Sequence, residues 1–368
     1  MSSKAVSSKV CVVAAGGTGG HMFPAEALAR EMAARGWRVV LATDTRGERY
    51  AQAFPAEERL ALDAATGSGP VGLLKAAVAI LKGVTQARRA FRRLDAGVVV
   101  GFGGYPSAPA LVAALVDGLP TVIHEQNAVL GRTNRMLAPR VKAVASSFPT
   151  LGRAAPAVAA RAQVVGSPVR AEIAGLMDRA YVPPAPNGRI EVLVTGGSQG
   201  ARLLSEAVPA ALAQLPPDLR ARLKVRQQSR PDAMEAARQT YLEAGIEAEV
   251  APFFRDMAGL LSVAHLVIGR AGASTCSELA VAALPSVLVP LKIATDDHQT
   301  LNARALVEAG AAVVIAEDDL TPAHLAETLA PLLSDPARLA AMSVAARSAA
   351  IPDAARRLAD LVEATAGA

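Results

Sequence analysis

The sequence predicts an α/β protein built from two doubly wound, parallel-sheet domains. The chain has 368 residues, which is too many for one ordinary hydrophobic core. Short runs rich in β-branched residues alternate with longer segments of helical period, a pattern typical of parallel sheets covered by helices. The segment VVAAGGTGG at 12–20 is matched by VLVTGGSQG at 192–200, so the second half restarts the pattern of the first.

The first half contains six apolar runs that are expected to form buried strands. They span residues 9–15, 37–43, 96–101, 120–125, 142–147 and 162–166. Helical segments are expected between several of them, including 24–36 and 108–118. Residues 96–116 carry no charge, but Gly101, Gly103, Gly104 and two prolines interrupt them. We therefore expect strand, loop and helix there and no transmembrane segment.

The second half repeats this organisation after a stretch rich in proline, residues 177–189, which is expected to be a linker. The predicted strands span residues 189–197, 223–228, 247–253, 265–270, 285–291 and 311–317. The predicted domains are residues 1–169 and 170–349, and a C-terminal helix at 352–366 could belong to either.

Composition narrows the functional classes. The net charge is +5 and the pI is about 9.5, but no basic stripe is interleaved with aromatic residues, so nucleic acid is not an expected partner. Cys11 and Cys276 lack the spacing of metal ligands, and two lone thiols fit a reducing compartment. The N-terminal apolar run is too short for a signal peptide, so a soluble, cytoplasmic chain is expected.

Three glycine loops follow predicted strands, at 16–20, 101–104 and 196–200. Such loops usually bind phosphate groups through backbone amides, although any one of them could be a tight turn alone. None completes the spacing of a dinucleotide fingerprint, and the chain has no Gly-Lys pair for a Walker loop. Ligands of doubly wound sheets lie at the carboxyl ends of the strands, so a diphosphate ligand is expected at these loops.

Seven longer motifs occur in a fixed order along nearly the whole chain. They are GGTGGHMFPA (16–25), GFGGYPSAP (101–109), HEQNAVLGRTNR (124–135), VGSPVR (165–170), GGSQGA (196–201), RAGASTCSE (270–278) and DDHQTLNA (296–303). Together they resemble the MurG family of bacterial N-acetylglucosaminyltransferases. The resemblance implies two Rossmann-like domains facing across a cleft, the glycosyltransferase B fold. The N-terminal domain would face the acceptor and membrane, and the C-terminal domain would bind UDP-GlcNAc.

The resemblance also implies the reaction and its partners. GlcNAc would move from UDP-GlcNAc, with inversion, to the C4 hydroxyl of undecaprenyl-pyrophosphoryl-MurNAc-pentapeptide (lipid I), giving lipid II for peptidoglycan. The implied location is peripheral, at the cytoplasmic face of the inner membrane, with contacts to other cell-wall synthesis proteins and roles in cell shape and division. No cofactor is implied.

Family positions transfer onto this sequence residue by residue. The nucleotide-sugar contacts of the family fall on Thr18, Gly19, Gly20, Asn127, Arg170, Ser198, Phe254, Ala273, Ser274, Thr275, Glu278 and Gln299. The loop expected to bind the acceptor diphosphate contains Gly103, Gly104 and Tyr105.

The residues themselves suit this chemistry. Histidine is the side chain suited to proton transfer near neutral pH, so His21 could deprotonate the acceptor hydroxyl, or it could only hydrogen-bond its own loop. Glu125 is the alternative base, an acceptor-positioning group or a helix cap. Ser198 and the amides at 273–275 could stabilise the leaving diphosphate at helix N-termini. Glu278 could accept both ribose hydroxyls, or could only favour the helix dipole.

No metal site is expected. The chain has no Asp-x-Asp pair flanked by an apolar strand, and Asp296 and Asp297 are expected to be solvated or to cap a loop.

Residues 71–94 form a basic amphipathic helix in this prediction. Its apolar stripe contains Leu73, Ala77, Ile80, Val84, Ala87 and Phe91, with lysines and arginines on the flanks. Such a helix could lie on an anionic membrane surface or could pack on its own sheet.

Three rival functions remain at this stage. A UDP-GlcNAc 2-epimerase shares the fold and the donor but would require further acid and base carboxylates. A non-catalytic nucleotide-sugar sensor would bind UDP-GlcNAc without needing His21. An NAD-dependent oxidoreductase is weakened by the missing fingerprint.

Overall fold

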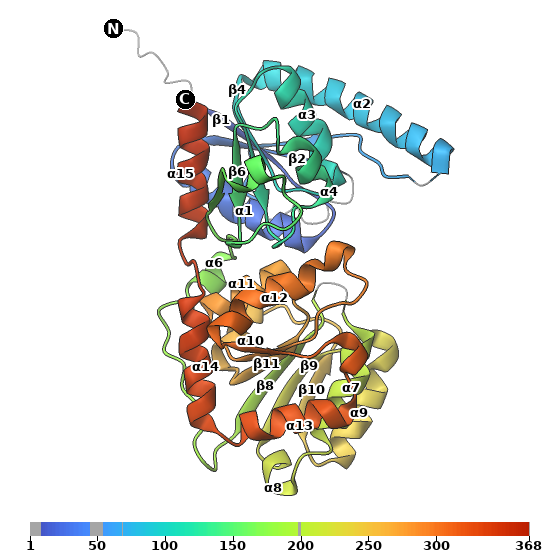
Figure 1. Ribbon diagram of the computed structural model, residues 1–368, viewed down its shortest axis with the longest axis vertical. Helices are drawn as coiled ribbons and strands as arrows, with labels where there is room; N and C mark the ends of the chain where they lie inside the picture. Colours follow the sequence, from blue (N-terminus) through green and yellow to red (C-terminus); the bar gives the residue numbers. More distant parts are fainter. Residues whose placement is uncertain (1–8, 45–53, 68, 198–199, 368) are drawn as a thin grey trace. The chain divides into compact units, whose positions relative to one another are not determined.

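The computed structural model describes residues 9–44, 54–67, 69–197 and 200–367. These residues divide into two compact units, which are coloured in chain order in Figure 1. The first unit runs up to Arg170 and resumes at Asp353, and the second is Ala171–Pro352. Each unit contains one fully parallel sheet with helices, so the prediction of two doubly wound α/β domains is confirmed.

The sheet of the first unit has the strand order β3-β2-β1-β4-β5-β6-β7. Its strands are β1 (Val10–Ala14), β2 (Arg38–Thr43), β3 (Glu58–Ala61), β4 (Ala96–Gly101), β5 (Thr121–Glu125), β6 (Ala143–Ser146) and β7 (Ala162–Val164). Its helices are α1 (Gly19–Ala34), α2 (Gly69–Leu94), α3 (Ala108–Val116), α4 (Arg132–Leu137), α5 (Pro156–Ala159) and α15 (Ala354–Gly367), with a 3-10 turn η2 (Tyr105–Ser107).

Alternation along β1 divides the core of this unit into two layers. Val10, Val12 and Ala14 pack with residues of α2 and α3 on one face of the sheet. Cys11 and Val13 pack with residues of α1 and α15 on the other face. Because successive side chains of a strand point to opposite faces, one apolar run supplies both layers.

The sheet of the second unit has the strand order β10-β9-β8-β11-β12-β13. Its strands are β8 (Ile190–Thr195), β9 (Leu223–Gln228), β10 (Glu247–Ala251), β11 (Leu266–Gly269), β12 (Ser286–Leu288) and β13 (Ala312–Val314). Its helices are α6 (Ala171–Ala174), α7 (Arg202–Leu212), α8 (Pro217–Arg220), α9 (Met234–Glu243), α10 (Met257–Val263), α11 (Ala273–Val281), α12 (His298–Ala309), α13 (Pro322–Leu333) and α14 (Pro336–Ser348), with 3-10 turns η3 (Pro231–Ala233), η4 (Thr295–Asp297) and η5 (Glu317–Asp319).

Strand order reverses at one place in each sheet. The reversal lies between β1 and β4 in the first unit and between β8 and β11 in the second. Loops that leave these strands in opposite directions open a crevice at the carboxyl edge, where ligands of such sheets bind. The loops at 16–20, 101–104, 196–200 and 270–273 follow these four strands.

Two sequence expectations about the chain path were wrong. Strand β3 was missed because its sequence, ERLA, is a short edge segment with no apolar run. The stretch 177–189 was expected to link the domains, but it belongs to the second unit. Tyr181 anchors it there, since its ring packs against the core and its hydroxyl donates to the His265 carbonyl, 3.0 Å away.

Helix α15 returns to the first unit and completes its core. Leu358 is fully buried against residues of α1 and the sheet. Glu363 accepts hydrogen bonds from Arg35 at 2.7 Å and from the Trp37 indole at 2.9 Å. These contacts lower the pKa of the Glu363 carboxyl, the Trp37 hydrogen bond contributing most.

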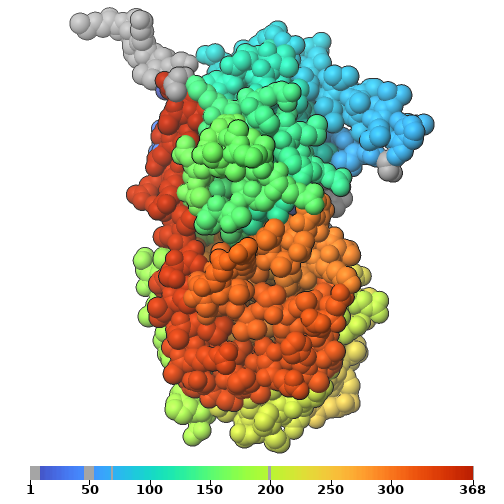
Figure 2. Space-filling view, viewed as in Figure 1, coloured from blue at the N-terminus to red at the C-terminus, as the bar shows by residue number. Residues whose placement is uncertain are grey.

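Helix α2 divides into two halves with different surroundings. Val84, Ala87 and Phe91 are buried in the core of the first unit, so for these residues the alternative that the stripe packs on its own sheet is correct. Arg88 and Arg92 donate to Asp117, within the same unit. The N-terminal half extends beyond the sheet in Figure 1 and forms a free ridge in Figure 2. Its exposed apolar side chains are Val71, Leu73, Leu74, Val78 and Leu81.

The uncharged segment 96–116 is divided between β4, a loop and α3, as the sequence predicted. Within the described part of the chain, we find no helix that is both long and apolar enough to cross a bilayer.

The contribution of α15 to the first unit can be tested at its buried leucine. Leu358→Ala leaves a cavity in the layer between α15 and the sheet, so we expect a loss of about 2–5 kcal/mol of stability. The midpoint of thermal unfolding measures this loss. Arg356→Ala, on the exposed side of the same helix, is the matched control. An unfolding midpoint equal to that of the control would contradict this packing.

Candidate active site

The first glycine loop leads directly into α1. Thr18 is the exposed N-cap residue, and Gly19 and Gly20 lie in the first turn, where amide groups point away from the helix and can bind an oxyanion. Gly16 lies so close to the next loop that a Cβ there would come within 2.8 Å of the Pro106 Cβ. The loops at 16–20 and 101–106 are therefore in contact.

His21 lies where these two loops meet. Gly104 has a φ of 70°, and a Cβ at this position would be 3.5 Å from Nε2 of His21. The positive φ favours glycine at this position, and the distance shows that the imidazole lies in van der Waals range of the loop. Tyr105, beside it, donates its hydroxyl hydrogen to Oδ2 of the buried Asp44 at 2.8 Å, which holds the loop down on the end of β2.

The other ring nitrogen of His21 contacts the loop that follows β5. Its Nδ1 lies 3.1 Å from Oε1 of Gln126. The amide nitrogen of Gln126 lies 3.1 Å from Nδ1 of His124, and Nε2 of His124 lies 2.9 Å from the Gly166 carbonyl. Gln126 and His124 are both buried. His21 is thus tied to the sheet by a chain of side chains.

Glu125 is 2% exposed, and both of its carboxylate oxygens accept hydrogen bonds. Oε1 accepts from the backbone of Asn127 at 3.1 Å and from its side chain at 3.3 Å. Oε2 accepts from the backbone of Gly131 and from Nδ2 of Asn134, each at 2.9 Å. Gly131 is the N-cap residue of α4, so this carboxylate holds the loop 125–134 on the start of that helix.

Arg170 is the last residue of the first unit and is half-buried there. Its guanidinium carbon lies 4.8 Å from the centre of the Phe23 ring, on the first turns of α1. This cation–π contact places a positive charge near the glycine loop that opens α1.

In the second unit, the loop after β8 is held by one buried amide. Gln228 accepts from the backbone of Gly196 at 3.2 Å and donates to the carbonyl oxygens of Gly197 at 3.0 Å and Pro252 at 3.3 Å. The same side chain therefore joins the glycine loop to the segment that contains the half-buried Phe254. Ser198, a predicted contact in this loop, lies outside the described residues.

The N-terminus of α11 follows β11 after the short connection 270–272. Ala273, Ser274 and Thr275 form its first turn, and Glu278 is half-buried one turn further on. Among the described residues, the hydroxyl oxygen of Ser274 is buried without a hydrogen-bond partner. An oriented hydroxyl beside first-turn amides is a donor set suited to a phosphate oxygen.

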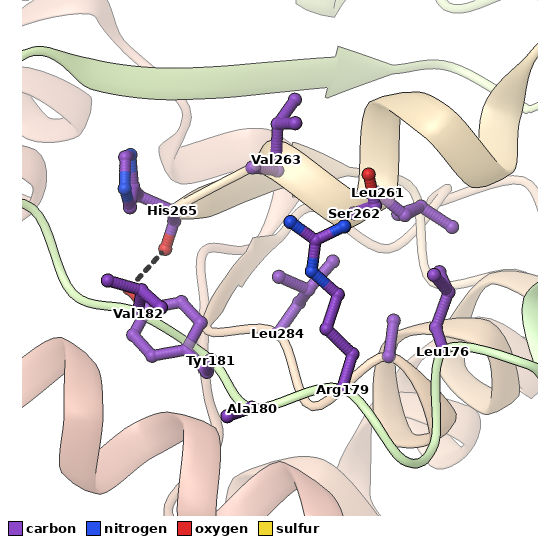
Figure 3. A pocket seen from close by; sticks show the side chains of 12 residues that line it. Leu176, Arg179, Ala180, Tyr181, Val182, Leu261, Ser262, Val263, His265 and Leu284 are labelled. Atoms are coloured by element: carbon purple, nitrogen blue, oxygen red, sulfur yellow. Dashed lines mark hydrogen bonds between the residues drawn. The ribbon is translucent and has the colours of Figure 1, made fainter.

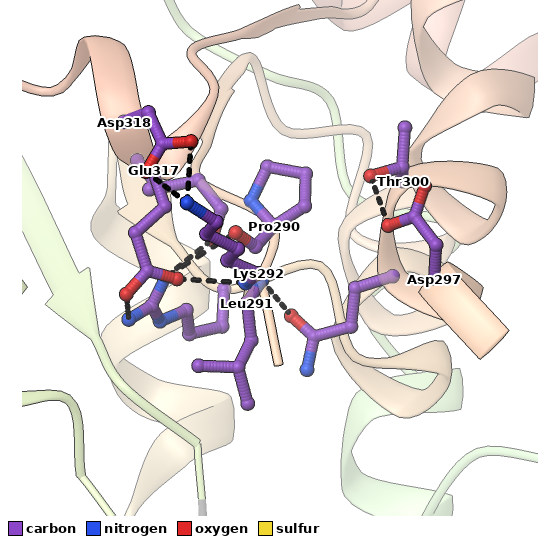
Figure 4. Close-up of polar contacts among 10 residues, drawn as sticks. Pro290, Leu291, Lys292, Asp297, Thr300, Glu317 and Asp318 are labelled. Carbon is purple, nitrogen blue, oxygen red and sulfur yellow. Dashed lines mark hydrogen bonds and ion pairs between the residues drawn. The ribbon is translucent and has the colours of Figure 1, made fainter. Parts of the chain in front are cut away.

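The segment after β12 is fixed by a polar network (Figure 4). The buried Arg270 donates to Glu317 at 3.0 Å, and Glu317 accepts from the backbone of Lys292 at 2.8 Å. Gln299, on the first turn of α12, accepts from the backbone of Leu291 at 3.0 Å. One turn later, Asn302 donates to the Ala271 carbonyl at 3.2 Å, so α12 is tied to the start of α11.

The acidic pair before α12 has a local role. Asp296 and Asp297 have φ values of 58° and 51°, and Asp297 accepts from the Thr300 hydroxyl at 2.7 Å. No group of three or more His, Cys, Asp or Glu residues in the described ranges has the arrangement of a metal site.

A separate cavity of the second unit lies away from these loops (Figure 3). Its lining includes Arg179, Tyr181, Val263, His265 and Leu284. His265 immediately precedes β11, so the cavity lies at the amino edge of the sheet, whereas the glycine loops leave the carboxyl edge.

The structure therefore groups the predicted residues into two sets, one in each unit. The first set contains Thr18, Gly19, Gly20, His21, Gly103, Gly104, Tyr105, Glu125, Asn127 and Arg170. The second contains Phe254, Ala273, Ser274, Thr275, Glu278 and Gln299.

Sequence reasoning missed the side chains that hold the loops in place. They are the buried amides Gln126, Asn134, Gln228 and Asn302. Gln126 and Asn134 lie in the motif HEQNAVLGRTNR, Asn302 lies in DDHQTLNA, and Gln228 ends the run LKVRQQ. One sequence signal could have identified them. Gln126 and Gln228 stand at the carboxyl ends of predicted strands, and Asn134 and Asn302 stand in motifs that follow such strands.

Comparison with known protein families also divides the chain into two domains. Residues 11–146 match the glycosyltransferase family 28 N-terminal domain, and residues 191–358 match the C-terminal domain of the same family. The chain belongs to glycosyltransferase family 28.

Within that family, the chain is 64% identical over 361 residues to a Caulobacter vibrioides protein, covering 98% of this chain and 99% of the relative. That protein is named UDP-N-acetylglucosamine–N-acetylmuramyl-(pentapeptide) pyrophosphoryl-undecaprenol N-acetylglucosamine transferase. The crystal structure of Acinetobacter baumannii MurG is 35% identical, with a TM-score of 0.79 over 97% of this chain and 99% of that one. A structure titled putative UDP-N-acetylglucosamine 2-epimerase, from Listeria monocytogenes, is 16% identical over 95% of this chain and 94% of that one, with a TM-score of 0.65, and shares only the fold.

The burial of His124 has a measurable consequence for stability. Desolvation lowers its pKa from 6.5 to about 4. Between these pH values the unfolded chain binds a proton that the folded protein does not, so the free energy of unfolding falls as the pH drops from about 6.5 to about 4. The expected loss is on the order of 3 kcal/mol, and above about pH 6.5 this group has no effect.

Thermal unfolding at about pH 7 and about pH 4.5 tests this expectation. His124→Asn has no titrating imidazole, so its unfolding midpoint should depend less on pH than that of the unmodified protein. An equal pH dependence in both proteins would show that His124 is not the group responsible.

Proposed function

We propose that the chain transfers N-acetylglucosamine from UDP-GlcNAc to the C4 hydroxyl of lipid I, forming lipid II with inversion at the sugar carbon. The observation that carries the proposal is His21, held by Gln126 with its Nε2 beside Gly104, in a chain of family 28. The first unit activates the acceptor, and the second unit binds the donor.

His21 is the base of this reaction, and Glu125 is a structural residue. A general base must come within hydrogen-bond reach of the hydroxyl that it deprotonates. The Glu125 carboxylate is buried and accepts hydrogen bonds at both oxygens from its own loop. His21 is half-buried, and its Nε2 faces the loop 103–105 that binds the acceptor diphosphate.

The donor diphosphate binds at the N-termini that follow β8 and β11. Amides of the first turn of α11 and the hydroxyl of Ser274 stabilise the charge that develops on the leaving UDP. Glu278 accepts hydrogen bonds from the ribose hydroxyls. Gln299 is held beside the start of α11 by the hydrogen bond that it accepts from the Leu291 amide. Fixed donors replace a metal in this account, because they need no reorganisation during the reaction.

The rival functions fit these sites less well. An epimerase of this fold would need acid and base carboxylates, but the buried carboxylates described at the first site, Glu125 and Asp44, hold the loops 125–134 and 103–105 in place. A non-catalytic sensor would not require Nε2 of His21 to face the loop 103–105. The dinucleotide fingerprint of an oxidoreductase is absent from the sequence.

Two substitutions separate the roles of the units. His21→Ala should lower kcat by about 10²–10⁴-fold, because the acceptor hydroxyl loses its base, with the donor KM nearly unchanged. Glu278→Ala should raise the donor KM, with a smaller effect on kcat, because it removes a ribose contact. Transfer of labelled GlcNAc from UDP-GlcNAc to a lipid I analogue measures both parameters.

Each variant serves as the control for the other, because His21 lies in the first unit and Glu278 lies in the second. Full turnover in His21→Ala would remove His21 from the mechanism. A fall in kcat alone for Glu278→Ala would refute the ribose contact.

We further propose that the N-terminal half of α2 contacts an anionic membrane at its cytoplasmic face, where the lipid acceptor is presented. Leu74, Val78 and Leu81 recur at helical spacing on the exposed ridge. Lys75 and Lys82 flank them, and the chain carries a net charge of +5. An apolar stripe flanked by cations matches the interface of an anionic bilayer.

Vesicle binding tests the membrane contact. Replacing Leu74, Val78 and Leu81 together by Ser should weaken binding to phosphatidylglycerol vesicles about tenfold or more, because apolar burial at three positions is lost. Turnover with a soluble acceptor analogue should not change. Replacing the exposed Leu242 and Val344 of the second unit by Ser is the matched control. Equal vesicle affinity in both variants would exclude this half of α2 as the membrane contact.

A further inference from the structure

We propose that Gln126 and His124 are positioning residues that place the proton of His21 on Nδ1 and so leave Nε2 as the basic nitrogen. This inference rests on the proposed role of His21 as the base. A neutral imidazole has two tautomers, and only one of them presents an unprotonated Nε2. The surroundings of His21 must select that tautomer for Nε2 to accept a proton.

The hydrogen bonds that link His21, Gln126 and His124 run in one direction from donor to acceptor. The backbone carbonyls of Gly166 and His124 define this direction, because they can only accept. The Gly166 carbonyl can only accept, so Nε2 of His124, 2.9 Å away, must carry a hydrogen. Because His124 is neutral, its Nδ1 is then an acceptor. The group of Gln126 that faces it, 3.1 Å away, must be the NH2 group.

A second contact gives the same orientation of Gln126. Its amide nitrogen also lies 3.4 Å from the backbone carbonyl of His124, which cannot donate. With the NH2 group facing two acceptors, Oε1 of Gln126 must face His21. Nδ1 of His21, at 3.1 Å, therefore donates to that oxygen.

Burial maintains this direction. His124 is fully buried, and desolvation lowers its pKa to about 4, so it stays neutral at physiological pH. A proton on Nδ1 of His124 would reverse the Gln126 amide, and the NH2 group would then face His21. That reversal would favour the tautomer of His21 whose Nε2 carries the hydrogen.

The orientation of His21 matches this assignment. Gln126, which directly follows β5, accepts the hydrogen bond from Nδ1 of His21. Nε2 of His21 lies on the side of Gly104, in the acceptor loop. Gln126 and His124 do not reach that loop themselves in these contacts. They act on the acceptor through His21.

The position of the proton can be observed directly. In protein labelled with 15N at histidine, long-range 1H–15N spectra distinguish the two tautomers, and His21→Ala assigns the signals of His21. We expect the unmodified protein to show the Nδ1–H tautomer at His21. Gln126→Leu should lose this preference and should lower kcat about 10–100-fold, with the donor KM within about twofold.

Gln126→Glu can keep both bonds as the neutral acid, whose carbonyl oxygen accepts from Nδ1–H of His21 and whose hydroxyl donates to Nδ1 of His124. In that form it should retain the Nδ1–H tautomer and recover much of the turnover that Gln126→Leu loses. Gln86→Leu is the matched control, because it also removes a bonded carboxamide from the first unit, one that contacts Asp63. It should leave the His21 spectrum and kcat unchanged.

The outcomes separate this inference from the proposed function. An Nε2–H tautomer at His21 in the unmodified protein would overturn the inference even if Gln126→Leu does not fold. An unchanged Nδ1–H tautomer in Gln126→Leu would also overturn it. Full turnover in His21→Ala would instead refute the base that the proposed function assigns, whatever the tautomer.

Discussion

Buried amide side chains hold the loops at the carboxyl edges of both sheets, and the candidate site depends on them. Backbone groups that leave a parallel sheet lose their ladder partners and require others when they are buried. Gln126 and Asn134 supply such partners in the first unit, and Gln228 and Asn302 supply them in the second. A carboxamide suits this role because it donates and accepts without carrying a charge into the interior.

This constraint explains how glycine loops without a binding fingerprint can still have defined shapes. Gln228 bonds to Gly196 and Gly197 at the start of the loop after β8, and the Arg270–Glu317 pair fixes the segment before α12. In the first unit, the neighbouring residues Glu125 and Gln126 bond to different partners. One holds the start of α4, and the other holds His21. Structural and chemical roles are thus divided between adjacent residues of one motif.

The sequence predicted the two sheets well because their strands are buried on both faces and so form continuous apolar runs, such as VCVVA in β1. It missed β3, whose four residues at the sheet edge carry no such run. For α2, periodicity identified the helix but could not show that Phe91 is buried while Leu74 is exposed, since that depends on where the sheet ends. The glycine loops and His21 were predicted from motifs. The roles of Gln126 and Gln228 depend on contacts between distant segments, which spacing does not reveal.

The most direct test of the account is the configuration of the new glycosidic bond. If His21 activates the acceptor for a single displacement, transfer from UDP-α-GlcNAc must give a β-linked disaccharide, with one UDP released for each sugar transferred. The proton coupling constant at the anomeric carbon of the product measures this configuration. A β linkage is the predicted result. An α linkage would require a different mechanism and would contradict the role that we assign to His21.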